Sequence, residues 1–473
     1  MQTAVTRELP GGVVRGVEIE GGIAWRGLPY AAAPAGPLRY RPPEPAPPWT
    51  GIRDASAYGA KAMQVPAAGA SEDCLFLNVA APLSPGPGGA PVLVCLHGGG
   101  FVSGSGPEYV GDGAAFVRQG IVVVSLNYRL GPLGFLDLSD RLGPAYERSA
   151  NLGILDQLAA LRWVRDTISV FGGDPGRVTV GGVSAGAKSV ATLLASPLSA
   201  GLFGRVISES GGGDHVARPG SSLAGRLLDV LGTTADGLLT VPAEQIVEAA
   251  GTFAGLFENT WIWRPTLDPV VLPRLPVDAV AAGAGAGIGM LIGSNAHEAA
   301  AFRLLHPDLV GRAPLVLGRA LGESRAQALI ADYASRRPAA PAADVYEALM
   351  TDERYGIPST RLADAQSAHA PTYRFYADLP VPGLPPEARG AHGSEVPYVF
   401  GLLPAETPLS QAMQRHWASF VRDGAPGADW PRYSPADRAT MVFADDAAVV
   451  HDPAGADRRA WDGLTWPSGT WLP

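Results

Sequence analysis

Ser184 lies in the pentapeptide Gly182-Val183-Ser184-Ala185-Gly186, the pattern of a nucleophilic serine. The apolar segment before it, Val178–Val180, predicts a strand, and a helix is expected to open at Ala187. In such a turn small neighbours let the strand and helix approach, while the hydroxyl projects at the helix N-terminus. A glycine-rich turn with a solvent-facing serine is the alternative. We predict that Ser184 is the nucleophile of an acyl-transfer reaction.

A run of glycines, His97-Gly98-Gly99-Gly100-Phe101, directly follows the apolar segment Val92–Leu96. Backbone N–H groups of such a loop can point at the oxyanion that forms during ester cleavage, and removing one donor typically costs about 2.7–4 kcal/mol. A flexible loop or a phosphate-binding turn is the alternative, but the Gly-Lys-Ser/Thr signature of the latter is absent. We therefore predict an oxyanion hole here, with His97 packing beside it rather than acting as the base.

The general base is expected late in the chain, because hydrolases built on an α/β sheet use the order serine, acid, histidine. His392 lies in a loop of small residues after the predicted strand Tyr373–Tyr376, where an imidazole can reach the nucleophile. His416 falls inside a helical pattern and His451 lies near the C-terminus without such a context. His392 is therefore the predicted base.

The acid that orients this histidine should follow an intermediate strand. Met290–Gly293 is such a strand, and Glu298 comes five residues after it. A buried carboxylate there would hold the imidazole tautomer and stabilise the imidazolium. Asp268 and Asp352, on predicted loops, remain alternatives to Glu298.

The elements that must position these residues read as an α/β fold with a mostly parallel central sheet flanked by helices. A helix over Leu155–Ser169 separates two of the apolar strands, as in a right-handed crossover. Residues 1–50 contain short strands and turns. The segments 214–285 and 300–365 carry helical patterns and are expected to form a cap or gorge over the carboxyl edge of the sheet, within one domain spanning 1–473. The remaining predicted strands are Ile121–Leu126 and Arg205–Ser208.

Composition excludes several classes of function. Hydrophobic residues make up 47% and charged residues 17% of the chain, which predicts a globular protein with a large core. The net charge of −9 argues against nucleic-acid binding, which needs a basic face. The most apolar stretch, Ala279–Gly293, is shorter than the roughly 18 residues of a membrane span. No secretory signal is visible and the two cysteines give no disulfide framework, so a cytoplasmic location is expected.

The chain resembles the type-B carboxylesterase family, and in particular its bacterial members. The resemblance covers nearly the whole chain and implies the α/β-hydrolase fold. The motifs that carry it are Gly27–Ala31, Leu38–Tyr40, Ser71–Val79, Asn127–Leu130, Asn151–Gly153, Phe171–Pro175, Trp417–Phe420 and Trp430-Pro431.

Carried over by position, the resemblance implies the same site residues as the local patterns. The nucleophile falls on Ser184, the acid on Glu298 and the base on His392, while the family's His-x-x-Glu pattern persists as His392 to Glu395. The oxyanion-hole donors fall on the backbone N–H groups of Gly99, Gly100 and Ala185. No metal or organic cofactor is implied.

Two positions depart from the family pattern. Val183 stands where the family has a glutamate before the nucleophile, a glutamate that is linked to a buried serine matching Ser210. A neutral residue would make the site drier and less negative, so a choline-like substrate is not expected. Cys74 lacks the upstream cysteine with which the family pairs it, and Cys95 in its predicted strand is expected to be an inert core thiol.

These features predict a serine carboxylesterase that takes a small-molecule ester. An amidase or carbamate hydrolase with the same triad stays open, as does a non-catalytic scaffold or adhesion protein of the same fold. Whether the protein is a monomer or a homodimer also stays open. Five aromatic residues of the insertions could equally line the pocket or fill the core: Phe253, Phe257, Trp261, Trp263 and Phe302.

Overall fold

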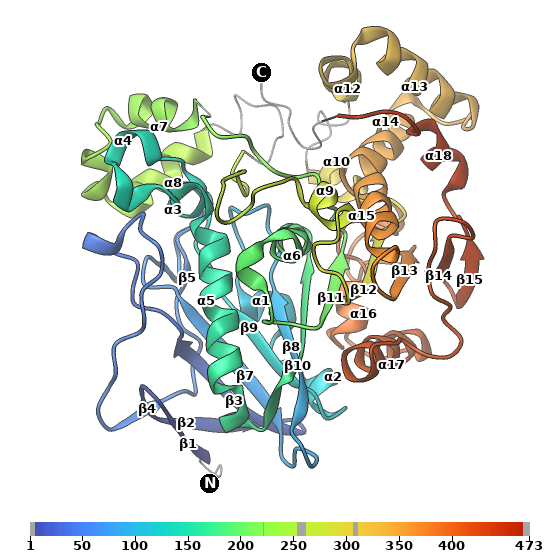
Figure 1. The fold of residues 1–473 in the computed structure, drawn as a ribbon. Coiled ribbons are helices and arrows are strands. Elements are labelled where there is room, and N and C mark those ends of the chain that lie inside the picture. Colours follow the sequence, from blue (N-terminus) through green and yellow to red (C-terminus); the bar gives the residue numbers. More distant parts are fainter. Residues whose placement is uncertain (1–4, 221, 253–261, 306–310, 467–473) are drawn as a thin grey trace.

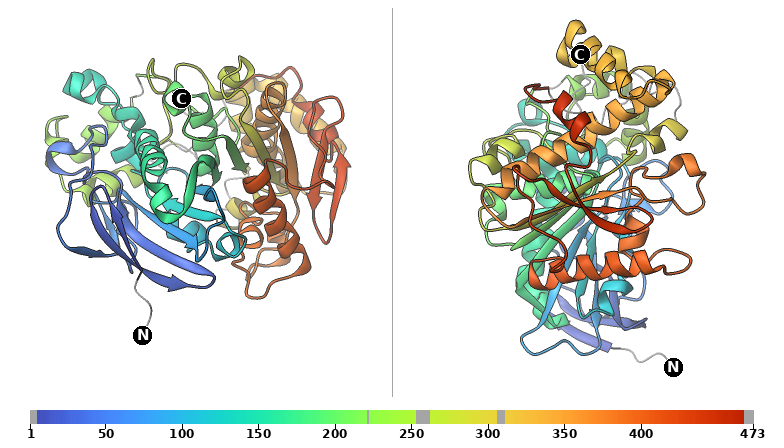
Figure 2. Two further views of the ribbon diagram at one scale, coloured as in Figure 1. Left: turned by 60° about the horizontal axis from the view of Figure 1, so that its bottom comes forward. Right: turned by 90° about the vertical axis from the view of Figure 1, so that its right-hand side faces the viewer.

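A 13-stranded sheet forms the centre of the structure, a computed structural model that describes residues 5–220, 222–252, 262–305 and 311–466. The strands follow the order β1-β2-β3-β7-β9-β8-β10-β11-β12-β13-β14-β15, with β4 beside β2 (Figures 1 and 2). From β9 to β14 neighbouring strands are parallel, and the pairs outside this block on the main path are antiparallel. The main strands are β1 (Val5–Leu9), β2 (Gly12–Ile19), β3 (Gly22–Pro29), β4 (Ile52–Asp54), β7 (Phe76–Pro82), β8 (Ala90–Leu96), β9 (Val122–Leu126), β10 (Gly173–Val183), β11 (Arg205–Glu209), β12 (Gly289–Asn295), β13 (Thr372–Ala377), β14 (Ala439–Phe443) and β15 (Ala447–His451).

The central strands are buried on both faces, as their continuous apolar runs predicted. Along β8, Val92, Val94 and Leu96 belong to the apolar cluster on one face of the sheet. Leu93 and Cys95 alternate with them and belong to the cluster on the other face. The six predicted strands are confirmed, and their alternation divides the core into two layers.

Helices cover both faces of the sheet (Figure 2). The first layer packs α5 (Leu152–Thr167), α6 (Ala185–Ala195) and α15 (Ile357–Ser367) into one core cluster. The helix predicted over Leu155–Ser169 is α5, which starts three residues earlier. The opposite layer contains α2 (Ala114–Val117), α16 (Val396–Val399) and α17 (Pro408–Asp423).

The carboxyl ends of the parallel strands meet at one edge of the sheet, which is where ligands bind in open α/β folds. The glycine run follows β8 and Ser184 follows β10, while Glu298 and His392 lie beyond β12 and β13. Further helices come from the two predicted helical segments, and Figure 1 shows α7 and α8 apart from α12, α13 and α14. They are α7 (Leu223–Leu231), α8 (Ala243–Gly251), α9 (Pro276–Ala281), α10 (Ala300–Leu305), α12 (Ala313–Leu321), α13 (Glu323–Ser335) and α14 (Ala342–Thr351).

Candidate active site

Ser184 occupies a strained turn between β10 and α6. Its φ of 56° and ψ of −121° lie in a region that non-glycine residues rarely adopt. The turn is too tight for side chains on its glycines: a Cβ on Gly186 would lie 2.0 Å from the Leu96 carbonyl oxygen, and one on Gly182 would lie 2.5 Å from the Gly186 carbonyl carbon. The backbone therefore projects the Ser184 hydroxyl from the sheet edge at the N-terminus of α6.

The glycine run after β8 lies directly against this turn. A Cβ on Gly98 would be 3.1 Å from the Ser184 Cβ. Gly99 (φ 102°) and Gly100 (φ 62°) have left-handed backbones, which glycine adopts without strain. Over the described ranges, the N–H groups of Gly99, Gly100 and Ala185 donate no hydrogen bond to another residue. The three predicted donors thus lie on the two segments that meet at this turn, with their protons unused.

Glu298 and His392 form a short polar contact at the site. Glu298 Oε2 lies 2.6 Å from His392 Nδ1, and the carboxylate is fully buried. Its other oxygen accepts hydrogen bonds from the Ser210 hydroxyl at 2.5 Å and from the Asn295 backbone N–H at 2.8 Å. A carboxylate that accepts three hydrogen bonds holds the imidazole proton on Nδ1 and leaves Nε2 as an acceptor.

Tyr355 packs against the histidine of the site. Its ring centroid is 4.5 Å from that of His392. Burial and then the charge of Glu298 raise the pKa of Tyr355 well above its usual value. No hydrogen bond joins Ser184 to His392 in the described structure, where His392 Nε2 is buried without a partner. Such catalytic bonds are often long before substrate binds.

Tyr355 and Lys188 are site residues that the sequence did not reveal. Tyr355 comes from a π-helical turn, Asp352–Gly356, and such turns often mark functional sites. Lys188 follows Ser184 by one helical turn, and its ammonium donates to the Gly211 carbonyl at 2.7 Å and lies 5.0 Å from the Tyr355 ring. Burial lowers the pKa of Lys188 to about 8. A helical pattern alone does not show where a π-turn re-aims a side chain.

The alternative acids are engaged elsewhere. Asp268 accepts a hydrogen bond from Asn151 at 2.5 Å and two from backbone N–H groups of its own turn. Asp352 accepts one from the Tyr333 hydroxyl. Of the three candidates, only Glu298 contacts His392 through a hydrogen bond.

The other histidines considered have structural surroundings. His97 stacks on Tyr128 with ring centroids 4.4 Å apart, and burial lowers its pKa to about 4. His416 packs edge-on against Trp430. His451 is exposed and contacts a backbone carbonyl. The sequence-based choice among the histidines therefore agrees with their packing.

Val183 and Glu209 occupy one register position on neighbouring strands. Val183 packs in the apolar cluster on the second face of the sheet and brings no charge to this position. The Glu209 carboxylate, itself buried, accepts hydrogen bonds from the Tyr109 hydroxyl at 2.7 Å and the Trp417 indole at 2.8 Å. A buried carboxylate is thus present on the strand next to Val183, although position 183 itself is neutral.

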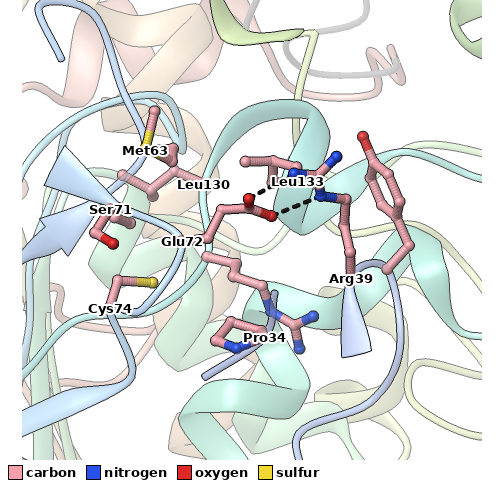
Figure 3. A pocket seen from close by; sticks show the side chains of 11 residues that line it. Pro34, Arg39, Met63, Ser71, Glu72, Cys74, Leu130 and Leu133 are labelled. Carbon is pink, nitrogen blue, oxygen red and sulfur yellow. Dashed lines mark hydrogen bonds and ion pairs between the residues drawn. The ribbon is translucent and has the colours of Figure 1, made fainter. Parts of the chain in front are cut away.

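Both cysteines are free and buried, as expected for the lone thiols. Cys95 lies inside β8. Cys74 lines a small pocket together with Met63 and Glu72 (Figure 3). In that pocket Arg39 and Glu72 form an ion pair of 2.5 Å. The packing gives neither thiol a reactive environment, and burial raises the pKa of both.

Of the five aromatic residues considered for the pocket, one borders the site and one is part of the core. Phe302 is 5.6 Å from His392 between ring centroids, so it borders the site. Trp263 is buried in the main core cluster. Phe253, Phe257 and Trp261 lie outside the described residues.

Within the ranges that the structure describes, no group of three or more histidine, cysteine or acidic side chains is arranged to hold a metal ion. Among the described helices, none has both the length and the apolarity needed to cross a membrane.

Known proteins match this chain over nearly its whole length. The sequence profile of the Carboxylesterase family matches residues 2–461. The chain is 38% identical to a para-nitrobenzyl esterase of Bacillus subtilis (strain 168), over 95% of this chain and 96% of that protein. It is 36% identical to a fumonisin B1 esterase of Sphingopyxis macrogoltabida, over 91% of this chain and 84% of that protein.

The fold has a matching solved structure. A carboxylesterase of Geobacillus stearothermophilus superposes with a TM-score of 0.87 and 36% identity, covering 97% of this chain and all of that chain. A solved para-nitrobenzyl esterase superposes with a TM-score of 0.85. The central sheet with its helices on both faces is therefore the α/β-hydrolase fold. The chain belongs to the carboxylesterase family and is a hydrolase that acts on ester bonds.

Proposed function

We propose that this hydrolase is a serine carboxylesterase that forms an acyl-enzyme on Ser184. The observation that carries the proposal is the 2.6 Å contact of Glu298 with His392 at the same sheet edge as the strained Ser184 turn. Each residue follows a different strand of the sheet, and a shared role in catalysis explains why they converge. Relatives named as esterases support an ester as the substrate.

In the first half-reaction, His392 Nε2 takes the proton of the Ser184 hydroxyl as its oxygen attacks the ester carbonyl carbon. The negative charge that develops on the carbonyl oxygen is stabilised by the N–H groups of Gly99, Gly100 and Ala185. Glu298 stabilises the imidazolium. The C–O bond to the alcohol then breaks, and the imidazolium gives its proton to the leaving alkoxide.

In the second half-reaction, water takes the place of the alcohol. His392 removes a proton from the water as it attacks the acyl carbon, and the proton passes to Ser184 when its ester bond breaks. The products are a carboxylic acid and the free enzyme. Every proton removed is returned and no atom changes its oxidation state, so the reaction needs no cofactor.

We also propose that residues 1–473 form one domain in which the segments 214–285 and 300–365 wall the substrate pocket. Two residues of the second segment support this, because Phe302 and Tyr355 both pack against His392. The walls would then decide which small ester fits, while the Ser184 turn performs the chemistry.

The decisive variant is Ser184→Ala. We expect its activity on a para-nitrophenyl ester to fall by about 10³-fold or more, as expected when a serine nucleophile is removed. A fluorophosphonate probe should label the unaltered enzyme and not the variant. Full activity of Ser184→Ala would refute the acyl-enzyme proposal. A matched ester and anilide of one acyl group, assayed side by side, would separate an esterase from an amidase.

A further inference from the structure

Asn295, the last residue of β12, lies fully buried behind the Glu298–His392 pair. Its side-chain amide is hydrogen-bonded on every side. The Nδ2 group donates to Glu395 Oε2 at 2.7 Å and to the Ser210 hydroxyl oxygen at 3.2 Å. The Oδ1 atom accepts from the Ser394 hydroxyl at 2.9 Å. The amide therefore has one orientation that satisfies all three neighbours.

This orientation sets the direction of the next hydrogen bond. A hydroxyl has a single proton. Because Ser210 accepts from the Asn295 amide, its own proton is left for Glu298 Oε1, at 2.5 Å. With the amide reversed, Oδ1 would face Ser210 and attract that proton. Glu298 would then keep two donors instead of three.

Glu395 is the neighbour that selects the orientation, because it offers Asn295 an acceptor and no hydrogen-bond donor at Oε2. Its side chain is fully buried, and Oε1 has no hydrogen-bond partner among the described residues. An ionised oxygen in that position would be costly. The ionisable groups that act on it are Glu209 from β11, Glu298 after β12 and Tyr109 (Gly106–Val110 helix). Burial, then Glu209 and Glu298, raise its pKa well above the usual value.

We propose that Glu395 is a neutral acid whose carbonyl oxygen fixes the Asn295 amide, and that both are positioning residues for Glu298 and His392. The inference rests on the proposed function, because it gives a reason for the geometry of the base. Glu395 and Asn295 act indirectly, through Glu298 and His392, since neither residue touches the Ser184 hydroxyl.

The test compares Glu395→Gln with Glu395→Leu by steady-state kinetics on a para-nitrophenyl ester. Glutamine is close to a neutral glutamic acid in shape and can present its carbonyl to Asn295. We expect its kcat/KM to stay within about threefold of the unaltered enzyme. Leucine removes the acceptor, and we expect a loss of about 10- to 100-fold in kcat with little change in KM.

The pH profile separates positioning from packing. Losing the Ser210 donor concentrates charge on Glu298, which stabilises the imidazolium. In Glu395→Leu the acidic limb of kcat/KM should therefore move to higher pH by about 0.5–1 unit. Asn295→Asp, nearly isosteric, should show the same limb shift even if Glu395→Leu folds poorly. Ser394→Ala, which removes a donor to the other end of the amide, should have a smaller effect.

Two results would overturn the inference. One is a Glu395→Gln variant as impaired as Glu395→Leu, because a charged role for Glu395 would then be required. The other is an unshifted acidic limb in Asn295→Asp. Labelling by the fluorophosphonate probe normalises each variant to its content of folded sites. If Ser184→Ala is inactive while these variants behave like the unaltered enzyme, this inference fails and the proposed function stands.

Discussion

The nucleophile and the acid–base pair lie at one edge of the sheet, but different parts of the chain position them. Ser184 is held by backbone: glycines on both sides, the end of β8 and the start of α6 leave its turn no room for extra atoms. Glu298, which holds His392, is itself held by the Ser210 hydroxyl and the Asn295 backbone N–H, and the Asn295 side chain donates to Glu395.

This difference separates stability from chemistry. A backbone turn that excludes even a methyl group fails by steric overlap, so its substitutions should reduce folding stability first. A hydrogen-bonded carboxylate fails by losing the right donor or acceptor, so its substitutions should reduce kcat while the fold persists. The following predictions test that separation, beginning with the largest effect.

Glu298→Gln should lower kcat by about 10³- to 10⁴-fold, in line with other serine hydrolases whose acid is converted to an amide. Glu298 accepts hydrogen bonds from three donors, so the NH₂ of a glutamine would have to face one of them. If the NH₂ faced His392, it would favour the tautomer with the proton on Nε2, which cannot accept the Ser184 proton. The measurement is kcat on a para-nitrophenyl ester together with a urea unfolding curve. The matched control is Glu387→Gln at an exposed turn, which should leave both unchanged. A variant with near-normal kcat would remove Glu298 from the mechanism.

Gly186→Ala should lower the free energy of unfolding by about 3 kcal/mol, because its Cβ would lie 2.0 Å from the Leu96 carbonyl oxygen. Gly204→Ala is the control, since no atom lies within 4 Å of its Cβ position. Urea unfolding of both variants measures the difference. Equal stability of the two variants would show that the Ser184 turn can relax and that steric overlap does not hold it.

Glu209→Gln should flatten the pH dependence of stability between about pH 5 and 7. Burial raises the pKa of Glu209 from 4.5 to about 7, so the folded state binds its proton more tightly than the unfolded state does. That contribution is fully present below pH 4.5 and is lost as the pH rises through 7. Between pH 5 and 7, the free energy of unfolding of the variant should change by about 1–2 kcal/mol less than that of the unaltered enzyme, as measured by urea unfolding. An unchanged slope would mean that Glu209 is charged throughout.

Much of the site was predictable because its residue types occur in local patterns. The Ser184 turn, the glycine run and the apolar strands are each readable within about ten residues, and the structure confirms the strands. The chain order of the acid and the base then limited the choice to a few candidates. Glu298 and His392 were chosen from loops after strands, and the structure brings these two into contact.

Other features lay beyond any local pattern. Tyr355 reaches His392 through a π-turn that resembles an ordinary helix in sequence. The buried carboxylate of Glu209 lies beside Val183 on the neighbouring strand, because strand register decides which residues become neighbours. The Asn295 amide is hydrogen-bonded to Ser394 and Glu395, which lie about 100 positions later in the chain.

The amino-acid sequence by itself determined the chemistry: glycines fix a turn around one serine, and apolar strands bring their ends to one edge. These are short-range consequences of backbone sterics and burial. Only the tertiary structure decided the direction of the hydrogen bonds behind Glu298, the placement of Tyr355 and the position of the buried carboxylates. Those depend on which distant side chains meet in the buried interior, where each donor must find an acceptor.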